Sequence, residues 1–271
     1  MKLENATLVI KLSGKNIDDA DCLDDISRQA VALQKLGAQV ILVHGGGMRI
    51  NQALKDAGIS PKFHQGQRVT DDATMEIVAR VLCDEVNSEL AEAIKKKGGE
   101  VIYGKQTQVL FSAPLDNDLN SGEYSEGNDA KRVKLGRVGK AVDSKPILGL
   151  NGQIAVMAPV AHDLVNGLEY NVNADWAAAA IAVSYKANYL FYMTDQDGVL
   201  DADSEVINQI SRDQIDGLIE QGIVTDGMIP KILSMRDALD QGVKRIVVVN
   251  GTTRNVISDV LNGEVAGTAI Y

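Results

Sequence analysis

Cysteine is scarce in this chain. The 271 residues include only Cys22 and Cys83, which are far apart and outside any spacing typical of a metal site. This excludes a disulfide scaffold and favours a reducing compartment, so we expect the protein in the cytoplasm. The sequence also lacks an apolar run long enough for a membrane span or for the core of a signal peptide, and it therefore predicts no export.

Aromatic residues and prolines are few as well. Aromatics make up 4% of the residues and there are 5 prolines, whereas 45% of the residues are hydrophobic. Such an aliphatic composition is typical of buried parallel strands covered by helices. The length is sufficient for one α/β unit with two lobes.

Positive charge is in deficit, and the formal net charge is −10. A surface of this sign repels nucleic acid and anionic membranes, so we expect neither as a partner. It repels anionic substrates too. A site for a phosphate or a carboxylate must therefore supply local positive charge from lysines, arginines or helix N-termini.

Strand-like and helix-like segments alternate along most of the chain. Apolar runs predict strands at 8–12, 38–43, 154–158, 168–172, 188–194, 245–249 and 266–270. Helical spacing predicts helices at 23–36, 71–97, 173–186 and 254–262, in the stretch that ends at residue 57, and from Asp226 onward. This order predicts an α/β fold with an open, mainly parallel sheet sandwiched by helices, in which lobes cover 1–165 and 166–271.

The segment 101–142 interrupts this alternation. It is polar and has strand-like pieces at 108–112 and 131–142. The stretch 116–129 between them predicts a mobile loop, within a β-hairpin region inserted near the mouth of a site.

Glycines follow two of the predicted strands. The triplet at 45–47 ends the strand 38–43 and opens a helix. Its amides and the helix N-terminus favour an anion, and the alternative is a tight turn without a ligand. Gly14 follows the first strand, three residues after Lys11. Lys11 either lies where open α/β sheets bind ligands or is a lysine of an edge strand in solvent.

Polar side chains mark other segment boundaries. Arg68 precedes the long predicted helix and can fork onto a carboxylate. The motif NVNAD at 171–175 spaces three polar residues by two, which exceeds what helix capping needs. The turn 194–201 either holds an adenosine or merely reverses the chain, and Lys231 by itself is typical of an ordinary surface lysine.

Other reactive groups give no recognisable site. His44, His64 and His162 are too scattered for a metal site, and Ser13 lacks the setting of a nucleophile. The chemistry must then come from lysines, glycine amides and carboxylates. That inventory suits phosphoryl transfer, which needs positioning and charge neutralisation more than covalent catalysis.

Several motifs occur together in one order along the chain. They are KLSG at 11–14, VHGGG at 43–47, QRVTDDATMEIV at 67–78, VNSEL at 86–90, NVNAD at 171–175, TDQDGVL at 194–200 and TDGMIPK at 225–231. In this order they resemble the amino acid kinase family over nearly the whole chain. The resemblance implies a homodimer, with a first lobe that binds an acylated amino acid and dimerises, and a second lobe that binds ATP.

The resemblance also implies roles for individual residues. Lys11 and Lys231 are expected to stabilise charge on the transferred phosphoryl group, with Asp175 holding both lysines. The residues expected to bind the acceptor are Gly46, Gly47, Arg68 and Asn171. Those expected to contact the nucleotide are Gly14, Gly45, Asp195, Gln196, Asp197, Gly198, Val199, Leu200, Ile223, Val224 and Thr225. Mg²⁺ is expected to bridge the ATP phosphates, without a metal site formed by protein side chains.

The activity that the resemblance implies is ATP-dependent phosphorylation of the side-chain carboxylate of N-acetylglutamate, a step of arginine biosynthesis. Five features depart from the family pattern: Ser13 replaces a glycine, 83–85 lack a usual glycine, Ser88 replaces a lysine, Trp176 replaces a small or polar residue, and the hairpin segment 103–112 lacks the usual glycine-aspartate pattern near the acyl pocket. Two alternatives therefore stay open. One is a kinase of another acylated dicarboxylic amino acid, such as N-acetyl-aminoadipate. The other is a non-catalytic amino-acid or nucleotide sensor of the same fold.

Overall fold

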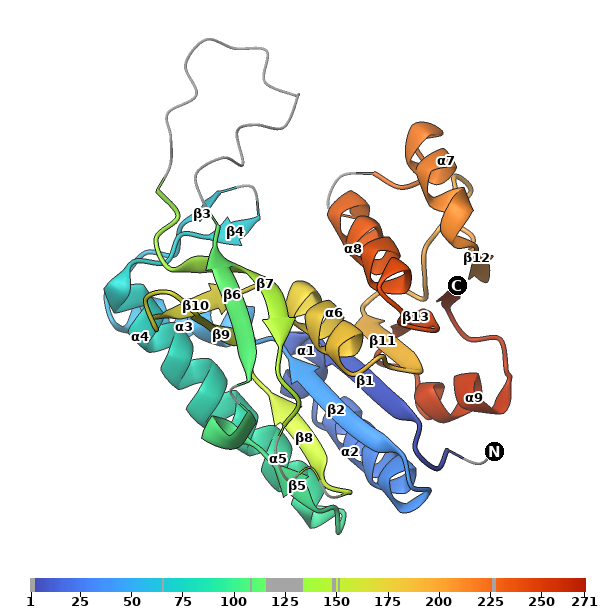
Figure 1. Cartoon of the computed structure of the whole chain (residues 1–271), viewed down its shortest axis with the longest axis horizontal. Coiled ribbons are helices and arrows are strands. Elements are labelled where there is room, and N and C mark those ends of the chain that lie inside the picture. Colours follow the sequence, from blue (N-terminus) through green and yellow to red (C-terminus); the bar gives the residue numbers. More distant parts are fainter. Residues whose placement is uncertain are drawn as a thin grey trace.

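The structure is a computed structural model that describes residues 3–64, 66–107, 109–115, 134–147, 150, 152–225 and 228–271 (Figure 1). The predicted loop 116–129 and the start of the predicted strand 131–142 lie outside the described residues, as does Asp226. Within the described ranges, no helix is long and apolar enough to cross a membrane.

The elements follow the predicted alternation. The helices are α1 Gly14–Asp18, α2 Ala20–Lys35, α3 Gly47–Asp56, α4 Asp72–Ala79, α5 Asn87–Lys96, α6 Ala174–Ser184, α7 Ile215–Glu220, α8 Met228–Asp240 and α9 Val256–Asn262, with a π-helical segment η1 Arg80–Val86 and short 3-10 turns η2 Gly104–Thr107 and η4 Arg212–Gln214. The strands are β1 Thr7–Leu12, β2 Gln39–His44, β3 Phe63–His64, β4 Gln67–Arg68, β5 Val101–Ile102, β6 Leu110–Pro114, β7 Val138–Ser144, β8 Ile154–Met157, β9 Val160–Asp163, β10 Glu169–Val172, β11 Tyr189–Thr194, β12 Gln209–Ile210, β13 Ile246–Asn250 and β14 Thr268–Ile270. The sequence did not predict the short elements α1, α7, β3, β4, β5, β9 and β12.

The main sheet has the strand order β12-β14-β13-β11-β1-β2-β8-β5. Every pairing in it is parallel except that of β13 with β14. This confirms the predicted mainly parallel sheet, and β1 lies near its centre.

Four other strands, β6, β7, β9 and β10, close into a small barrel. The antiparallel pair β6 and β7 confirms the predicted hairpin region. β10 pairs with both β7 and β9, so the predicted lobe boundary after residue 165 falls inside the barrel. The division into lobes stays a prediction, and this pairing favours a boundary beyond Val172.

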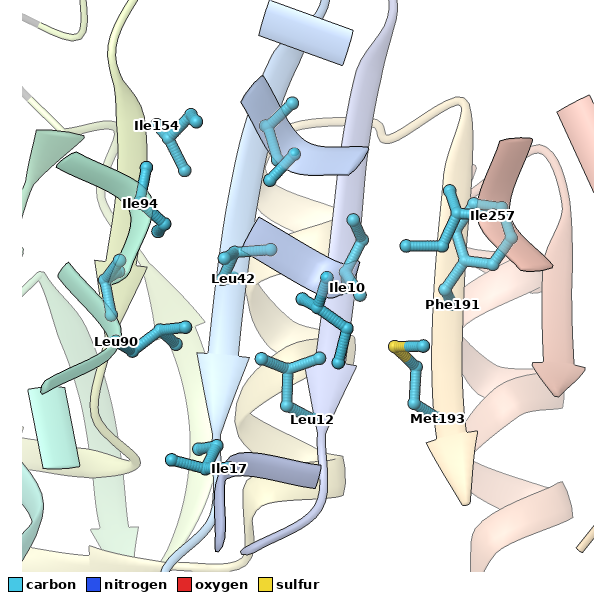
Figure 2. Close-up of a cluster of buried hydrophobic side chains, with 14 of the residues drawn as sticks. Ile10, Leu12, Ile17, Leu42, Leu90, Ile94, Ile154, Phe191, Met193 and Ile257 are labelled. Atoms are coloured by element: carbon cyan, nitrogen blue, oxygen red, sulfur yellow. The ribbon is translucent and has the colours of Figure 1, made fainter. Parts of the chain in front are cut away.

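The hydrophobic core has two layers, one on each face of the main sheet. Side chains alternate along β1, where Ile10 and Leu12 face one layer and Val9 faces the other. Figure 2 shows the first layer, in which Ile10 and Phe191 on the strands lie near Ile257 of α9. The helices α2, α3, α5 and α9 contribute to this layer, whereas α6, α7 and α8 contribute to the second. The protein is therefore a three-layer α/β sandwich, as predicted.

The long helix predicted over 71–97 begins and ends where expected but is not uniform. The Asp71 side chain caps its start by accepting from the backbone of Thr74. Between α4 and α5 the chain forms the π-helical segment η1 instead of an α-helix, which corrects the prediction. A Cβ atom on Gly46 would lie only 2.7 Å from Leu82 Cδ2, so η1 packs directly on the glycine triplet. Such π-helical insertions are frequent near functional sites.

Candidate active site

The candidate site lies at the carboxyl edge of three adjacent strands. Lys11 is near the end of β1, the triplet 45–47 follows β2, and Asp195 follows β11. The chain continues from β1 to β2 on one side and later adds β11 on the other, so the strand order reverses at β1. Open α/β sheets bind ligands at such a reversal.

The two glycine turns are in direct contact. A Cβ atom on Gly14 would lie 3.5 Å from Gly46 Cα, and one on Gly45 would lie 3.5 Å from Gly14 N. Gly46 precedes α3, and no side chain caps that helix. The N–H groups of its first turn are therefore available to an anion, as the sequence predicts.

Ser13, which departs from the family pattern, is used as a helix cap. Its hydroxyl donates to Asn16 Oδ1 at 2.7 Å and accepts from Asn16 N at 3.3 Å. Asn16 in turn packs on Gly251, where a Cβ atom would lie 2.1 Å from Asn16 Nδ2. The hydroxyl thus fixes α1, and its proton is committed to Asn16 rather than to a ligand.

A cavity of about 250 Å³ collects the residues predicted to bind the acceptor. It is bounded by the glycine triplet, the β3–β4 hairpin and the start of α6. The predicted residues that line it are Lys11, Gly45, Gly46, Gly47, Arg68, Asn171 and Asp175. We call it the acceptor cavity.

Arg68 is the main cation of the acceptor cavity. The residue is only 7% exposed, and its burial lowers the pKa of the guanidinium, which nevertheless stays charged at neutral pH. Nη2 donates to Gly47 O at 3.2 Å, and the Phe63 ring lies 4.7 Å from the guanidinium carbon. Nη1 is buried and has no hydrogen-bond partner among the described residues. A carboxylate is the ligand that would satisfy such a donor.

Asn171 is tied to the same cavity wall through Thr70. Its Nδ2 donates to Thr70 Oγ1 at 3.3 Å, and Thr70 Oγ1 donates to Arg68 O at 2.8 Å. The backbone of Thr70 also exchanges hydrogen bonds with Leu135 O, at 2.8 Å, and Arg137 N, at 2.6 Å. The segment that precedes β7 therefore braces the acceptor cavity.

A second cavity, of about 220 Å³, adjoins the first. Lys11 and Gly47 line both cavities. The other residues that line the second cavity are Ser13, Gly14, Lys15, Met48, Met193, Thr194, Asp195 and Lys231. We call it the phosphate cavity, because two lysines far apart in the sequence, Lys11 and Lys231, meet there.

Asp175 holds Lys11 in place. Lys11 Nζ lies 2.8 Å from Asp175 Oδ1, and both side chains are largely buried. Asp175 itself is positioned at the start of α6, where the Asn173 side chain accepts from its backbone N–H. The predicted contact of Asp175 with Lys231 stays a prediction.

The other residues predicted to contact the nucleotide lie on two loops of the C-terminal half. Those at 196–200 follow β11, and those at 223–225 connect α7 to α8. Val199 and Val224 belong to the same buried layer, so both loops contribute to one hydrophobic cluster. Their contact with a nucleotide stays a prediction.

His44 supports the glycine triplet from within the core. Burial lowers the pKa of His44 to about 4, so the ring is neutral at neutral pH. Nδ1 lies 3.2 Å from Gly45 O, and Nε2 lies 3.1 Å from Asn87 Nδ2. A neutral ring that donates from Nδ1 and accepts at Nε2 satisfies both contacts. Nothing in the sequence pattern predicts this role of His44, which was weighed there only as a metal ligand.

Lys15 and Phe63 are further site residues that the sequence did not indicate. Lys15 directly follows Gly14, and this adjacency was the available signal. Phe63 belongs to a hairpin too short to recognise from its pattern. No group of three or more His, Cys, Asp or Glu suited to hold a metal ion occurs within the described part of the chain.

Known proteins resemble this chain over nearly its whole length. Residues 6–250 match the amino acid kinase family. The acetylglutamate kinase of Aquifex aeolicus is 36% identical over 272 residues, which cover 97% of this chain and 90% of that protein. That of Methanospirillum hungatei is 34% identical over 277 residues, covering 99% and 92%.

Solved structures show the same fold. N-acetylglutamate synthase from Neisseria gonorrhoeae, in complex with coenzyme A and N-acetyl-glutamate, superposes with a TM-score of 0.80 at 23% identity. The match covers 99% of this chain but 60% of the synthase. Carbamate kinase from Giardia lamblia bound to AMP-PNP gives a TM-score of 0.66 at 18% identity, covering 98% of each chain. With the family and full-length relatives matched over nearly its whole length, the chain belongs to the amino acid kinase family.

Proposed function

We propose that this protein phosphorylates the side-chain carboxylate of N-acetylglutamate with ATP, producing an acyl phosphate and ADP, as a step of arginine biosynthesis. The observation that carries the proposal is the pair of adjoining cavities that share Lys11 and Gly47. One offers an unpaired arginine donor for a carboxylate and the other brings two lysines together for phosphates. The relatives named acetylglutamate kinase support the choice of acceptor.

The acceptor cavity suits an acylated amino acid. Arg68 Nη1 would bind the α-carboxylate, and Asn171 lies on the same wall through its contact with Thr70. The side-chain carboxylate would then extend past the glycine triplet toward Lys11, where the two cavities meet. It is already ionised at neutral pH, so the reaction needs no general base.

The transfer itself needs charge neutralisation. A carboxylate oxygen forms a bond to the γ-phosphorus while the bond to the bridging oxygen of ADP breaks. Lys11 and Lys231 would stabilise the charge on the phosphoryl oxygens, and Asp175 would keep Lys11 aimed at them. The amides of the two glycine turns would supply further donors.

Three further points belong to the proposal. Mg²⁺ would bind with the nucleotide, because in kinases it bridges the phosphates and neutralises their charge. The protein would act as a homodimer, joined through the lobe that contains the acceptor cavity. We place it in the cytoplasm, where its thiols stay reduced.

A panel of acceptors tests the proposal. ADP release is measured with ATP, Mg²⁺ and either N-acetylglutamate, N-acetyl-aminoadipate, glutamate, aspartate or carbamate, and hydroxylamine traps the acyl phosphate. N-acetylglutamate should give the highest kcat/KM and a hydroxamate. A preference for N-acetyl-aminoadipate would instead support the kinase alternative. Binding of ATP and acylated amino acid without turnover would support a sensor.

A further inference from the structure

Lys15 and Asp195 form an ion pair within the lining of the phosphate cavity. Lys15 Nζ lies 2.7 Å from Asp195 Oδ2, and the side chains are 65% and 59% exposed. A pair this exposed contributes little to folding stability. Its location is more informative, because both residues line the same cavity as Lys11 and Lys231.

The ion pair neutralises a carboxylate that would otherwise repel a bound polyphosphate. A polyphosphate brings several negative charges, and the carboxylate of Asp195 at the cavity wall would repel it. The contact with Lys15 neutralises this carboxylate. A lysine ammonium has three donors, of which Asp195 occupies one, so two remain for phosphate oxygens.

The backbone of Lys15 is also held in position. It belongs to α1, whose start is fixed by the reciprocal hydrogen bonds of Ser13 and Asn16. Gly14, one residue earlier, contacts the glycine triplet. The ammonium group is thus carried on a braced turn that lines the cavity, in contact with Asp195.

We propose that Lys15 is a third phosphate-binding lysine, which Asp195 holds at the phosphate cavity until the nucleotide arrives. This inference rests on the proposed function and assigns to Lys15 a part in nucleotide binding rather than in the chemical step. The reason is exposure: the Lys11 side chain is 13% exposed, whereas that of Lys15 is 65% exposed and its charge is screened by water. Lys15 should therefore bind the phosphates equally in the ground state and the transition state.

Titration calorimetry with AMP-PNP and Mg²⁺, without acceptor, tests the proposal. Lys15→Ala should weaken AMP-PNP binding by about two- to fivefold, the range of one partly screened charge contact. Adenosine binding should not change, because adenosine carries no phosphate, and the KM for ATP should rise by a larger factor than kcat falls. Lys35→Ala, which removes an exposed lysine from the last turn of α2, is the matched control and should bind AMP-PNP like the wild type.

A double variant separates direct contact from charge masking. Asp195→Asn combined with Lys15→Ala removes the carboxylate that Lys15 neutralises. If Lys15 contacts phosphate, the double variant stays weaker than Asp195→Asn alone. Equal affinity of these two variants would overturn the proposal, because Lys15 would then only mask Asp195. Equal losses for adenosine and AMP-PNP would overturn it as well.

Absence of AMP-PNP binding by the wild type would count against the proposed function, so the two failures are distinguishable.

Discussion

At the scale of single residues, the placement of the two lysines makes the sharpest prediction. Lys11→Ala or Lys231→Ala should lower kcat by about 10²–10³, because each removes a donor to charge that develops in the transition state. The KM values for ATP and N-acetylglutamate should change much less. Steady-state kinetics of both variants checks this. A raised KM with an unchanged kcat would remove the lysine from its catalytic role.

Arg68 should contribute to binding of the acceptor but not to binding of the nucleotide. Arg68→Lys should raise the KM for N-acetylglutamate about tenfold or more, because an ammonium cannot replace the fork that serves Gly47 O and a carboxylate together. The affinity for AMP-PNP should stay near that of the wild type, since Arg68 lines only the acceptor cavity of the two. Calorimetry with each ligand separates the effects. Weaker AMP-PNP binding would mean that the cavities are wrongly assigned.

His44 should make stability depend on pH. Its pKa is about 4 in the folded protein and 6.5 when unperturbed, so between these values the unfolded chain binds the extra proton. The free energy of unfolding should therefore decrease as the pH falls from 6.5 toward 4. His44→Asn removes the titrating group and should lose less stability over the same range. Urea unfolding of both proteins measures the difference, and parallel pH curves would contradict the prediction.

At the scale of elements, the turn before β7 controls the wall of the acceptor cavity. Gly136 has a φ of 75°, and a Cβ atom there would lie 2.2 Å from Thr70 O. Gly136→Ala should therefore cost more than the about 1 kcal/mol of a left-handed alanine and should displace Thr70. Gly152→Ala is the matched control, because Gly152 has a φ of 74° and nothing within 4 Å of its Cβ position. Gly136→Ala should unfold at a lower temperature and show a higher KM for N-acetylglutamate than Gly152→Ala.

At the scale of the whole molecule, the main sheet ends on the acceptor side in β5, a strand of two residues that forms the sheet edge among the described strands. An edge strand offers backbone groups for pairing with a second copy. We expect a homodimer with a mass of about 58 kDa, twice 29.0 kDa. Light scattering of the purified protein should give this value over a range of concentrations. A monomer or a larger assembly would contradict the prediction.

Local patterns by themselves determined much of this protein. Aliphatic runs and helical spacing predicted most strands and helices, because burial on a sheet face or a helix face imposes a period on the chain. The glycine turns were also recognisable, since each follows a strand at the edge where a parallel sheet exposes its ligand site. Arg68 and the motif 171–175 were recognisable because each comes directly before or at the start of a predicted helix. Lys231 was recognised only through the order of the motifs, because a lone lysine has no distinctive pattern.

Tertiary structure decided what depends on residues far apart in the chain. The meeting of Lys11, Lys15 and Lys231 in one cavity follows from the way β1 and β11 pair and from the position of α8, which no local period encodes. The barrel that draws β10 to β7 and the π-helical segment that packs on Gly46 are likewise set by long-range contacts. Ser13 shows the same limit, because its hydroxyl could face a phosphate or cap α1, and only its geometry with Asn16 distinguishes the two.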